Sequence, residues 1–240
     1  MSRISVLPLE GMPEVREGDD LAALLSESIE RAGGLEAGDV LVVAQKVVSK
    51  AEGRVVSLEE IEPSDQAREL AADHDPRHLE VILGEAARLV RVRAPLVIAE
   101  TRHGFVCASA GVDRSNAPGP DAAVLLPVDP DASARRLSER LGAPVIVSDS
   151  FGRPFRHGTT DVAIGVAGMA PLNDLRGVRD SAGYELKTTT IAVADEIAGA
   201  AELVMGKTAG IPAAIVRGLT PTGDGVARDL VMPAERDLFR

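Results

Sequence analysis

The sequence has little of several residue types on which particular protein classes depend. Of its 240 residues one is Cys and none is Trp, and the aromatic residues are four Phe and one Tyr. The lone Cys107 excludes an internal disulfide and a site built from several thiolates. So few aromatic rings leave no platform on which the bases of a single-stranded nucleic acid could stack. We therefore expect an aliphatic core.

Basic charge and long apolar runs are also scarce. The chain has 26 Lys and Arg against 37 Asp and Glu, for a formal net charge of -11. Because a phosphate backbone is neutralised by clustered Lys and Arg, we expect no nucleic-acid partner. No apolar run approaches the roughly 18 residues of a spanning helix, and the N-terminus lacks the order of a signal peptide. We expect a cytoplasmic protein with no membrane partner, which meets anionic ligands through a few placed cations or metal ions.

Hydrophobic residues make up 45% of the chain, and no linker-like stretch divides it, so we predict a single domain over residues 1–240. The predicted strands and helices given next alternate irregularly along the chain. This favours an α+β fold with mixed sheets over a doubly wound parallel sheet. Runs of β-branched residues predict strands at 4–7, 39–48, 96–99, 105–112, 144–148, 161–166, 186–193 and 212–217. Helical periodicity predicts helices at 20–32, 64–72, 76–90, 131–141 and 195–205.

Two segments pair short oxygen-bearing side chains with the end of a predicted strand. In the first, Asp113 is followed three residues later by Asn116, which suits a hard cation and a polar ligand atom. An ordinary Asx-turn explains the same pattern.

The second such segment ends a strand at Asp149 and Ser150, and a Gly turn with Arg153 and Arg156 follows. A carboxylate, a hydroxyl and two guanidinium groups are the parts of a Mg²⁺-phosphate site. The alternative is a helix-capping Ser beside surface arginines. Two Arg and an Asp around a Gly turn do not help to build a hydrophobic core, so this segment is the strongest candidate for a functional site in the sequence.

Two further segments carry lysines. Lys50 follows an apolar run that also contains Gln45 and Lys46, and it could reach a phosphate as a point charge or face solvent. Lys207 lies in a Gly206-Lys207-Thr208 turn that resembles part of a Walker A loop. Ala201 stands where that loop needs its first Gly, so the loop is excluded. What remains is an anion-binding nest or a helix C-cap.

The segments just described resemble the coenzyme F420:L-glutamate ligase family, also called F420-0:gamma-glutamyl ligase. The resemblance covers essentially the whole chain, in the right order. It rests on residues 8–21 (PLEGMPEVREGDDL), 47–56 (VVSKAEGRVV), 110–116 (AGVDRSN), 125–133 (LLPVDPDAS), 148–158 (SDSFGRPFRHG), 193–207 (VADEIAGAAELVMGK) and 211–218 (IPAAIVRG).

The resemblance implies a GTP-dependent ligase with two divalent metal ions, Mg²⁺ or Mn²⁺, that joins L-glutamate to coenzyme F420-0 through an acyl phosphate. It also implies an intertwined homodimer. Asp113 and Asp149 would hold the first metal ion and Ser150 the second, with Asp113, Asp149 and Lys50 as the catalytic set, while Arg153 and Arg156 would bind substrate. The nucleotide would contact Met12, Pro13, Glu14, Val15, Gln45, Lys50, Asn116 and the turn that contains Gly206, Lys207, Thr208 and Gly210.

The chain departs from the family pattern at three positions. Gln45 stands where Ser or Thr is usual, Ser150 replaces a frequent Thr, and Lys207 stands where archaeal members often have an acid. The chain also ends near where two-domain relatives continue into a reductase domain, so we expect no such domain here. The departures leave two alternatives open: a GTP- and metal-binding regulatory protein without turnover, and a ligase of the same fold for another acceptor.

Overall fold

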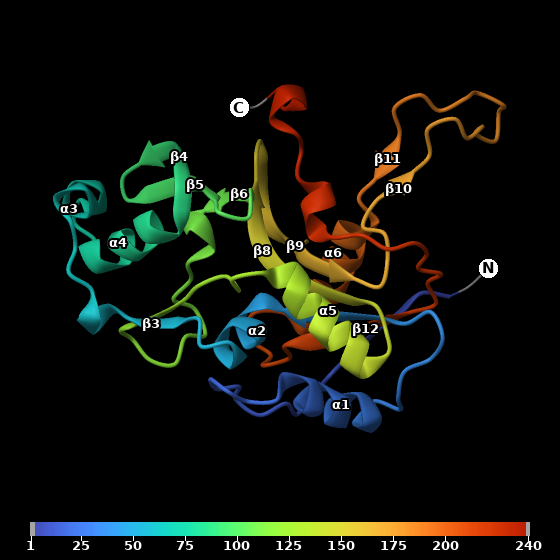
Figure 1. The fold of residues 1–240 in the computed structure, drawn as a ribbon, viewed down its shortest axis with the longest axis horizontal. Helices are drawn as coiled ribbons and strands as arrows, with labels where there is room; N and C mark the ends of the chain where they lie inside the picture. Colours follow the sequence, from blue (N-terminus) through green and yellow to red (C-terminus); the bar gives the residue numbers. More distant parts are fainter. Residues whose placement is uncertain (1–2, 239–240) are drawn as a thin grey trace.

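The computed structural model describes residues 3–238, and a five-stranded sheet lies at its centre (Figure 1). The strands lie in the order β1 (Ser5–Pro8), β12 (Ala213–Arg217), β2 (Val40–Ala44), β8 (Val145–Arg153) and β9 (Arg156–Ala167). Strands β2 and β8 are parallel and the other pairs are antiparallel. Together with the helices, this mixed sheet confirms the predicted α+β class.

Helices cover both faces of the central sheet because its inner strands are apolar on both sides. Leu41 and Val43 of β2 pack with α1 (Leu21–Arg31) and α5 (Pro130–Leu141). Val40 and Val42, which alternate with them, pack with α6 (Val193–Met205) on the opposite face. Strand β2 is therefore buried on both faces, and the chain reaches the protein surface only beyond the ends of this strand.

Residues 55–125 form a lobe with its own core beside the sheet, on the left in Figure 1. Its helical segments are η1 (Leu58–Glu60), α3 (Asp65–Ala71), α4 (Pro76–Glu85) and η2 (Ser109–Gly111). Its strands are β3 (Val55–Ser57) paired with β7 (Ala122–Val124), and the meander of β4 (Ala86–Arg93), β5 (Leu96–Thr101) and β6 (Val106–Ala108). Asp113 lies in the segment of the lobe between η2 and β7, and the chain returns to the sheet after β7 through α5.

The last part of the chain adds short elements around α6. Strands β10 (Asn173–Asp174) and β11 (Thr190–Ile191) form a ribbon whose connecting loop extends away from the body at the upper right of Figure 1. The single turns η3 (Ala227–Leu230) and η4 (Ala234–Arg236) lie near the C-terminus. Within residues 3–238, no helix is both long and apolar enough to span a bilayer.

Several sequence predictions of local structure are wrong. The strand predicted over 105–112 ends at Ala108 and gives way to η2, and the strand predicted over 144–148 continues to Arg153. The strand predicted over 39–48 ends at Ala44, and α2 (Gln45–Ala51) follows directly. The helix predicted to reach Val90 ends at Glu85 and gives way to β4. The strand predicted over 186–193 is regular only at Thr190–Ile191. Apolar residues fit both a helical and a strand period in these runs, so packing decides between them.

A buried ion pair ties two strands of the sheet together and gives a testable stability prediction. The Asp39 side chain is fully buried and accepts paired hydrogen bonds from Arg217 Nε and Nη2, at 3.0 and 2.8 Å. We expect Asp39→Asn to lower the free energy of unfolding at pH 7 by about 2 to 3 kcal/mol, because it removes the buried one of the two carboxylates that pair with the guanidinium and leaves only the exposed Glu36. Urea titration measures this loss, and the same substitution at the exposed Asp20 serves as control.

The pH dependence of that loss follows from the pKa of Asp39. Burial raises this pKa, but the hydrogen bonds from Arg217 and from the backbone N–H of Glu36 prevail and hold it below its ordinary value. The contribution of the carboxylate is therefore complete at neutral pH and falls as pH drops through the lowered pKa. We expect the stabilities of wild type and Asp39→Asn to converge as pH falls through the lowered pKa of Asp39. A difference in the free energy of unfolding between the two proteins that grows as pH falls would contradict this account.

Candidate functional site

Polar side chains gather where β2 ends and its parallel neighbour β8 continues past it. The strands are parallel and Ala44 lies opposite Ser148, so the residues that follow on each strand emerge at the same edge of the sheet. On the first strand this edge carries Gln45 and Lys46, which begin α2. On the second it carries Asp149 and Ser150.

Asp113 reaches the same edge from the lobe through a tight segment of backbone. Ser109 and Ala110 have φ values of 54° and 51°, in the left-handed region that non-Gly residues seldom adopt. Gly111 continues this turn at φ 75°, and a Cβ there would lie 2.6 Å from the Leu126 side chain. Asp113 then exchanges two backbone hydrogen bonds with Val124. A left-handed backbone conformation at a non-Gly residue costs free energy, so it persists only where contacts with the rest of the protein stabilise it. The packing around this segment therefore fixes the position of Asp113.

The carboxylate of Asp113 is bound within the chain. Lys46 Nζ lies 2.6 Å from Oδ2, and Ser115 donates its hydroxyl to Oδ2 and its backbone N–H to Oδ1, each at 2.8 Å. Burial raises the pKa of Asp113, but the bonds from Lys46 and Ser115 outweigh it and the net pKa is lowered. From its position within an apolar run, the sequence also predicts that Lys46 faces solvent. That prediction is wrong, because the Lys46 side chain is 16% exposed and paired with Asp113.

Asp149 lies in the electrostatic field of Asp113. Burial raises the pKa of Asp149 to about 7, and the charges of Asp161 and Asp113 add to this effect. The backbone N–H of Ser150 and the charge of Lys46 act in the opposite direction. Two acids that are distant in the sequence thus share one environment in a single chain. Their role as metal ligands stays a prediction.

A third acid at this edge, Asp161, was not among the predicted site residues. It is buried on β9 and accepts the hydroxyl of Ser150 at 2.6 Å and that of Ser148 at 2.8 Å. Because each hydroxyl has one hydrogen to donate, these bonds leave the lone pairs of Ser150 available to a cation. Sequence reasoning missed Asp161 because its relation to Ser150 depends on the register of the β8–β9 pair.

Two hollows lie at this edge. The first, here the strand-end pocket, has a volume of about 70 Å³, and the second, here the adjoining cavity, has about 630 Å³. Asn116 lines both, so the two meet at its side chain. The strand-end pocket is lined by Ala44, Gln45, Lys46, Asn116, Ser148, Asp149, Ser150, Asp161, Glu202, Met205, Gly206, Lys207 and Ile211. The adjoining cavity is lined by Glu14, Val15, Arg16, Glu17, Lys50, Gly53, Val55, Asn116, Ala117 and Pro118.

Lys50 and Gln45 both lie on α2, where a helix rather than a strand presents them. Lys50 lines the adjoining cavity, is 8% exposed and pairs with Glu14 at 2.5 Å. The reading of Lys50 as a solvated lysine is therefore wrong. Gln45 donates to Ser49 Oγ and to Leu125 O, each at 2.7 Å, and so ties α2 to the chain after β7. Its nucleotide contact stays a prediction.

The structure brings some of the other predicted residues to this edge and leaves others outside it. Asn116 Nδ2 donates to the carbonyl of Lys207 at 3.3 Å, which joins the Asp113 segment to the turn after α6. Gly206 caps α6, which confirms the C-cap interpretation of this turn, and it also lines the strand-end pocket. An anion-binding nest here stays a prediction. Neither hollow is lined by Met12, Pro13, Thr208, Gly210, Arg153 or Arg156.

Arg153 and Arg156 face each other at the exposed tip of the β8–β9 hairpin. Arg153 Nη2 donates to the carbonyl of His157 at 3.1 Å. The hairpin continues past the last residue of β2, so its tip lies beyond the central sheet (Figure 1). Their contact with substrate stays a prediction.

The donor set fits a hard divalent cation that completes its shell from elsewhere. Asp113 and Asp149 supply carboxylates and Ser150 a hydroxyl whose lone pairs are free, and such oxygen donors suit Mg²⁺ and Mn²⁺. Within residues 3–238, no three His, Cys, Asp or Glu side chains form a ready-made metal cage. A site with so few protein ligands is typical of Mg²⁺ bound through substrate phosphates and water.

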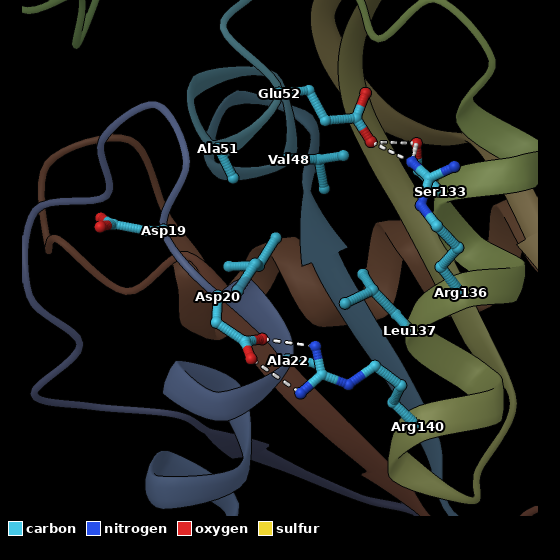
Figure 2. Close-up of a pocket in the computed structure, with 11 residues that line it drawn as sticks. Asp19, Asp20, Ala22, Val48, Ala51, Glu52, Ser133, Arg136, Leu137 and Arg140 are labelled. Carbon is cyan, nitrogen blue, oxygen red and sulfur yellow. Dashed lines mark hydrogen bonds and ion pairs between the residues drawn. The ribbon is translucent and has the colours of Figure 1, made fainter.

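The opposite side of α2 borders a separate pocket of about 240 Å³ between α1 and α5 (Figure 2). Figure 2 shows Arg136 directed at Glu52 and Arg140 at Asp20, and the shortest N–O distances of these ion pairs are 2.5 and 2.6 Å. Its charged rim is thus paired within the chain. None of the predicted site residues lines this pocket.

Comparison with known proteins identifies the family. A family model described as F420-0:Gamma-glutamyl ligase matches residues 11–218. The chain is 48% identical to the coenzyme F420:L-glutamate ligase of Methanothermobacter thermautotrophicus, over 99% of both chains. It is 51% identical to the protein of that name from Methanopyrus kandleri, over 99% of this chain and 97% of the relative. For the Natronomonas pharaonis protein of that name the identity is 44%, over 98% and 93%.

The chain therefore belongs to the F420-0:gamma-glutamyl ligase family, as the sequence resemblance indicated.

Proposed function

We propose that this protein is a GTP-dependent ligase that joins L-glutamate to the lactyl carboxylate of coenzyme F420-0 and extends the product with gamma-linked glutamates. The observation that carries the proposal is the near full-length similarity to relatives named coenzyme F420:L-glutamate ligase. The edge of the sheet supports it, because acids, hydroxyls and lysines meet there beside a cavity of about 630 Å³. That volume lies in the range that small-molecule ligands occupy.

In the proposed reaction the lactyl carboxylate takes the gamma-phosphoryl group of GTP, and the amine of glutamate then displaces phosphate from the acyl phosphate. Lys50 lines the adjoining cavity, and in this reaction it would offset charge on the triphosphate. Asp113, Asp149 and Ser150 would hold two divalent ions, which supply charge neutralisation on the phosphate oxygens. Asp161 holds Ser150 in the orientation that leaves its lone pairs free.

The proposal includes a homodimer in which the two chains intertwine. The β8–β9 hairpin and the β10–β11 ribbon support this part, because both extend from the body and carry exposed apolar residues. Phe155 at the hairpin tip is 90% exposed, and Val178 and Tyr184 of the ribbon loop are also exposed. Light scattering that gives twice the chain mass would support the dimer, and the single-chain mass would remove it.

A direct assay separates the proposed function from its alternatives. The protein is incubated with F420-0, L-glutamate, a divalent metal salt and one nucleotide at a time, and the products are weighed by mass spectrometry. We expect glutamylated coenzyme with GTP, and phosphate release only when precursor and glutamate are both present. Phosphate release indifferent to glutamate would contradict the proposal. GTP binding without product would favour the regulatory alternative. Product formed only when another acceptor replaces F420-0 would favour a ligase of different specificity.

A further inference from the structure

Lys46 binds the same carboxylate that a metal ion would have to share. Its ammonium lies 2.6 Å from Asp113 Oδ2 and 2.6 Å from Ser115 Oγ. The Ser115 hydroxyl donates to that Oδ2, and its backbone N–H donates to Oδ1. A carboxylate offers about four lone-pair sites. The chain itself therefore occupies most of the acceptor capacity of Asp113.

Lys46 is also held where its charge acts on both acids. It lies in the first turn of α2, its side chain is 16% exposed, and it lines the strand-end pocket together with Asp149. At short range and away from bulk water, a fixed positive charge strongly disfavours a second cation beside it. Lys46 is thus a built-in competitor for the position between Asp113 and Asp149.

We propose that Lys46 makes metal binding depend on the nucleotide, by holding Asp113 until a triphosphate offers its ammonium another acceptor. An ammonium displaced inside this pocket without a new partner would be an uncompensated buried charge, which is costly. A triphosphate that extends from the adjoining cavity past Asn116 into the strand-end pocket, which Lys46 lines, would supply that partner. The protein alone therefore binds divalent metal weakly, and metal enters as the nucleotide complex. This inference rests on the proposed function for the identity of the ligand.

The test measures Mn²⁺ binding to the full chain without nucleotide, by electron paramagnetic resonance of free Mn²⁺. Lys46→Met keeps a long unbranched side chain and removes its charge, and we expect it to bind Mn²⁺ about tenfold more tightly than wild type. Adding Asp113→Asn to Lys46→Met is expected to abolish the gain, which places the ion on Asp113. With GTP present the advantage of Lys46→Met is expected to disappear.

Lys207→Met is the matched control, because Lys207 lines the same pocket but its charge acts on Glu202 rather than on Asp113. Equal tightening in both variants would indicate a general charge effect and overturn the proposal, as would unchanged Mn²⁺ binding in Lys46→Met. Thermal melting checks that the variants fold, and Lys46→Gln serves if Lys46→Met does not. The ligase assay is independent: tightening without ligation would remove the proposed function and leave this inference standing.

Discussion

Asp149→Asn is expected to lower the turnover number of the ligase reaction by about a thousandfold or more. Asp149 lines the strand-end pocket and is one of the two carboxylates proposed to hold the first metal ion, and an amide there cannot offset the charge of a divalent cation. Charge stabilisation by a metal ion is worth several kcal/mol in the transition state, and each 1.36 kcal/mol is tenfold in rate. Initial rates of glutamylated product, measured by mass spectrometry, give the effect.

The same variant is expected to fold at least as stably as wild type. Burial and neighbouring acids raise the pKa of Asp149 to about 7, which means that its charged form is disfavoured in the folded chain. Removing that charge relieves the folded state, so thermal melting should show no loss of stability. Asp73→Asn, in the exposed turn after α3, is the matched control and should leave both rate and melting unchanged. More than a tenth of wild-type activity in Asp149→Asn would remove Asp149 from the metal site.

Lys50→Met is expected to weaken binding of GTP by about 10- to 100-fold. Lys50 is buried, lines the adjoining cavity and has Glu14 as its partner. A hydrogen bond to a charged group contributes about 1.5 to 3 kcal/mol, which corresponds to this range of affinity. The Glu14 side chain is mostly exposed, so losing its ion pair with Lys50 has little effect of its own on the affinity for GTP. Isothermal titration with a non-hydrolysable GTP analogue and Mg²⁺ measures the dissociation constant.

Lys187→Met is the matched control for this loss, because Lys187 is exposed in the loop of the β10–β11 ribbon. It removes the same charge from the chain without touching the adjoining cavity. We expect it to bind the analogue as wild type does. A similar loss in both variants would show that net charge, and not the position of Lys50, governs the affinity.

Local signals in the sequence predicted much of the fold. Asp20 caps α1 and Ser64 caps α3, as their positions before apolar periodic runs indicate. The same signals also predict Asp131 and Asp195 as caps, and both predictions are wrong. The cap of α5 is Asp129, because Pro130 takes the first helical position, and α6 begins after Ala192. These signals succeed because a cap and its partner lie within one turn of each other, so no distant part of the chain is needed to decide them.

The change from strand to helix at Gln45 could not be predicted from its own residues. Val47 and Val48 are buried in the core beneath α1 and α5, where a helix can place them. The apolar residues of the surrounding run fit the repeat of a helix and that of a strand equally well, so only packing against other segments selects the helix. That choice places Lys46 and Lys50 one turn apart, at the two hollows. A strand reading of the same run cannot give this arrangement.

The pairings within the site also escaped sequence reasoning. The partner of Lys46 is Asp113, from another lobe, and the partner of Ser150 is Asp161, across a hairpin. Such relations depend on topology and strand register, neither of which is encoded locally. The family resemblance named Asp113, Asp149 and Ser150, while the contacts that orient them required coordinates.

The most direct test of the central claim is anomalous diffraction from a crystal grown with Mn²⁺ and a non-hydrolysable GTP analogue. The claim is that Asp113 and Asp149 meet at one edge of the sheet to hold divalent cations against a triphosphate. We expect manganese peaks between these two side chains and beside Ser150, with phosphate density directed toward Lys50. Manganese bound elsewhere, with the carboxylate of Asp113 still held only by Lys46 and Ser115, would contradict the account.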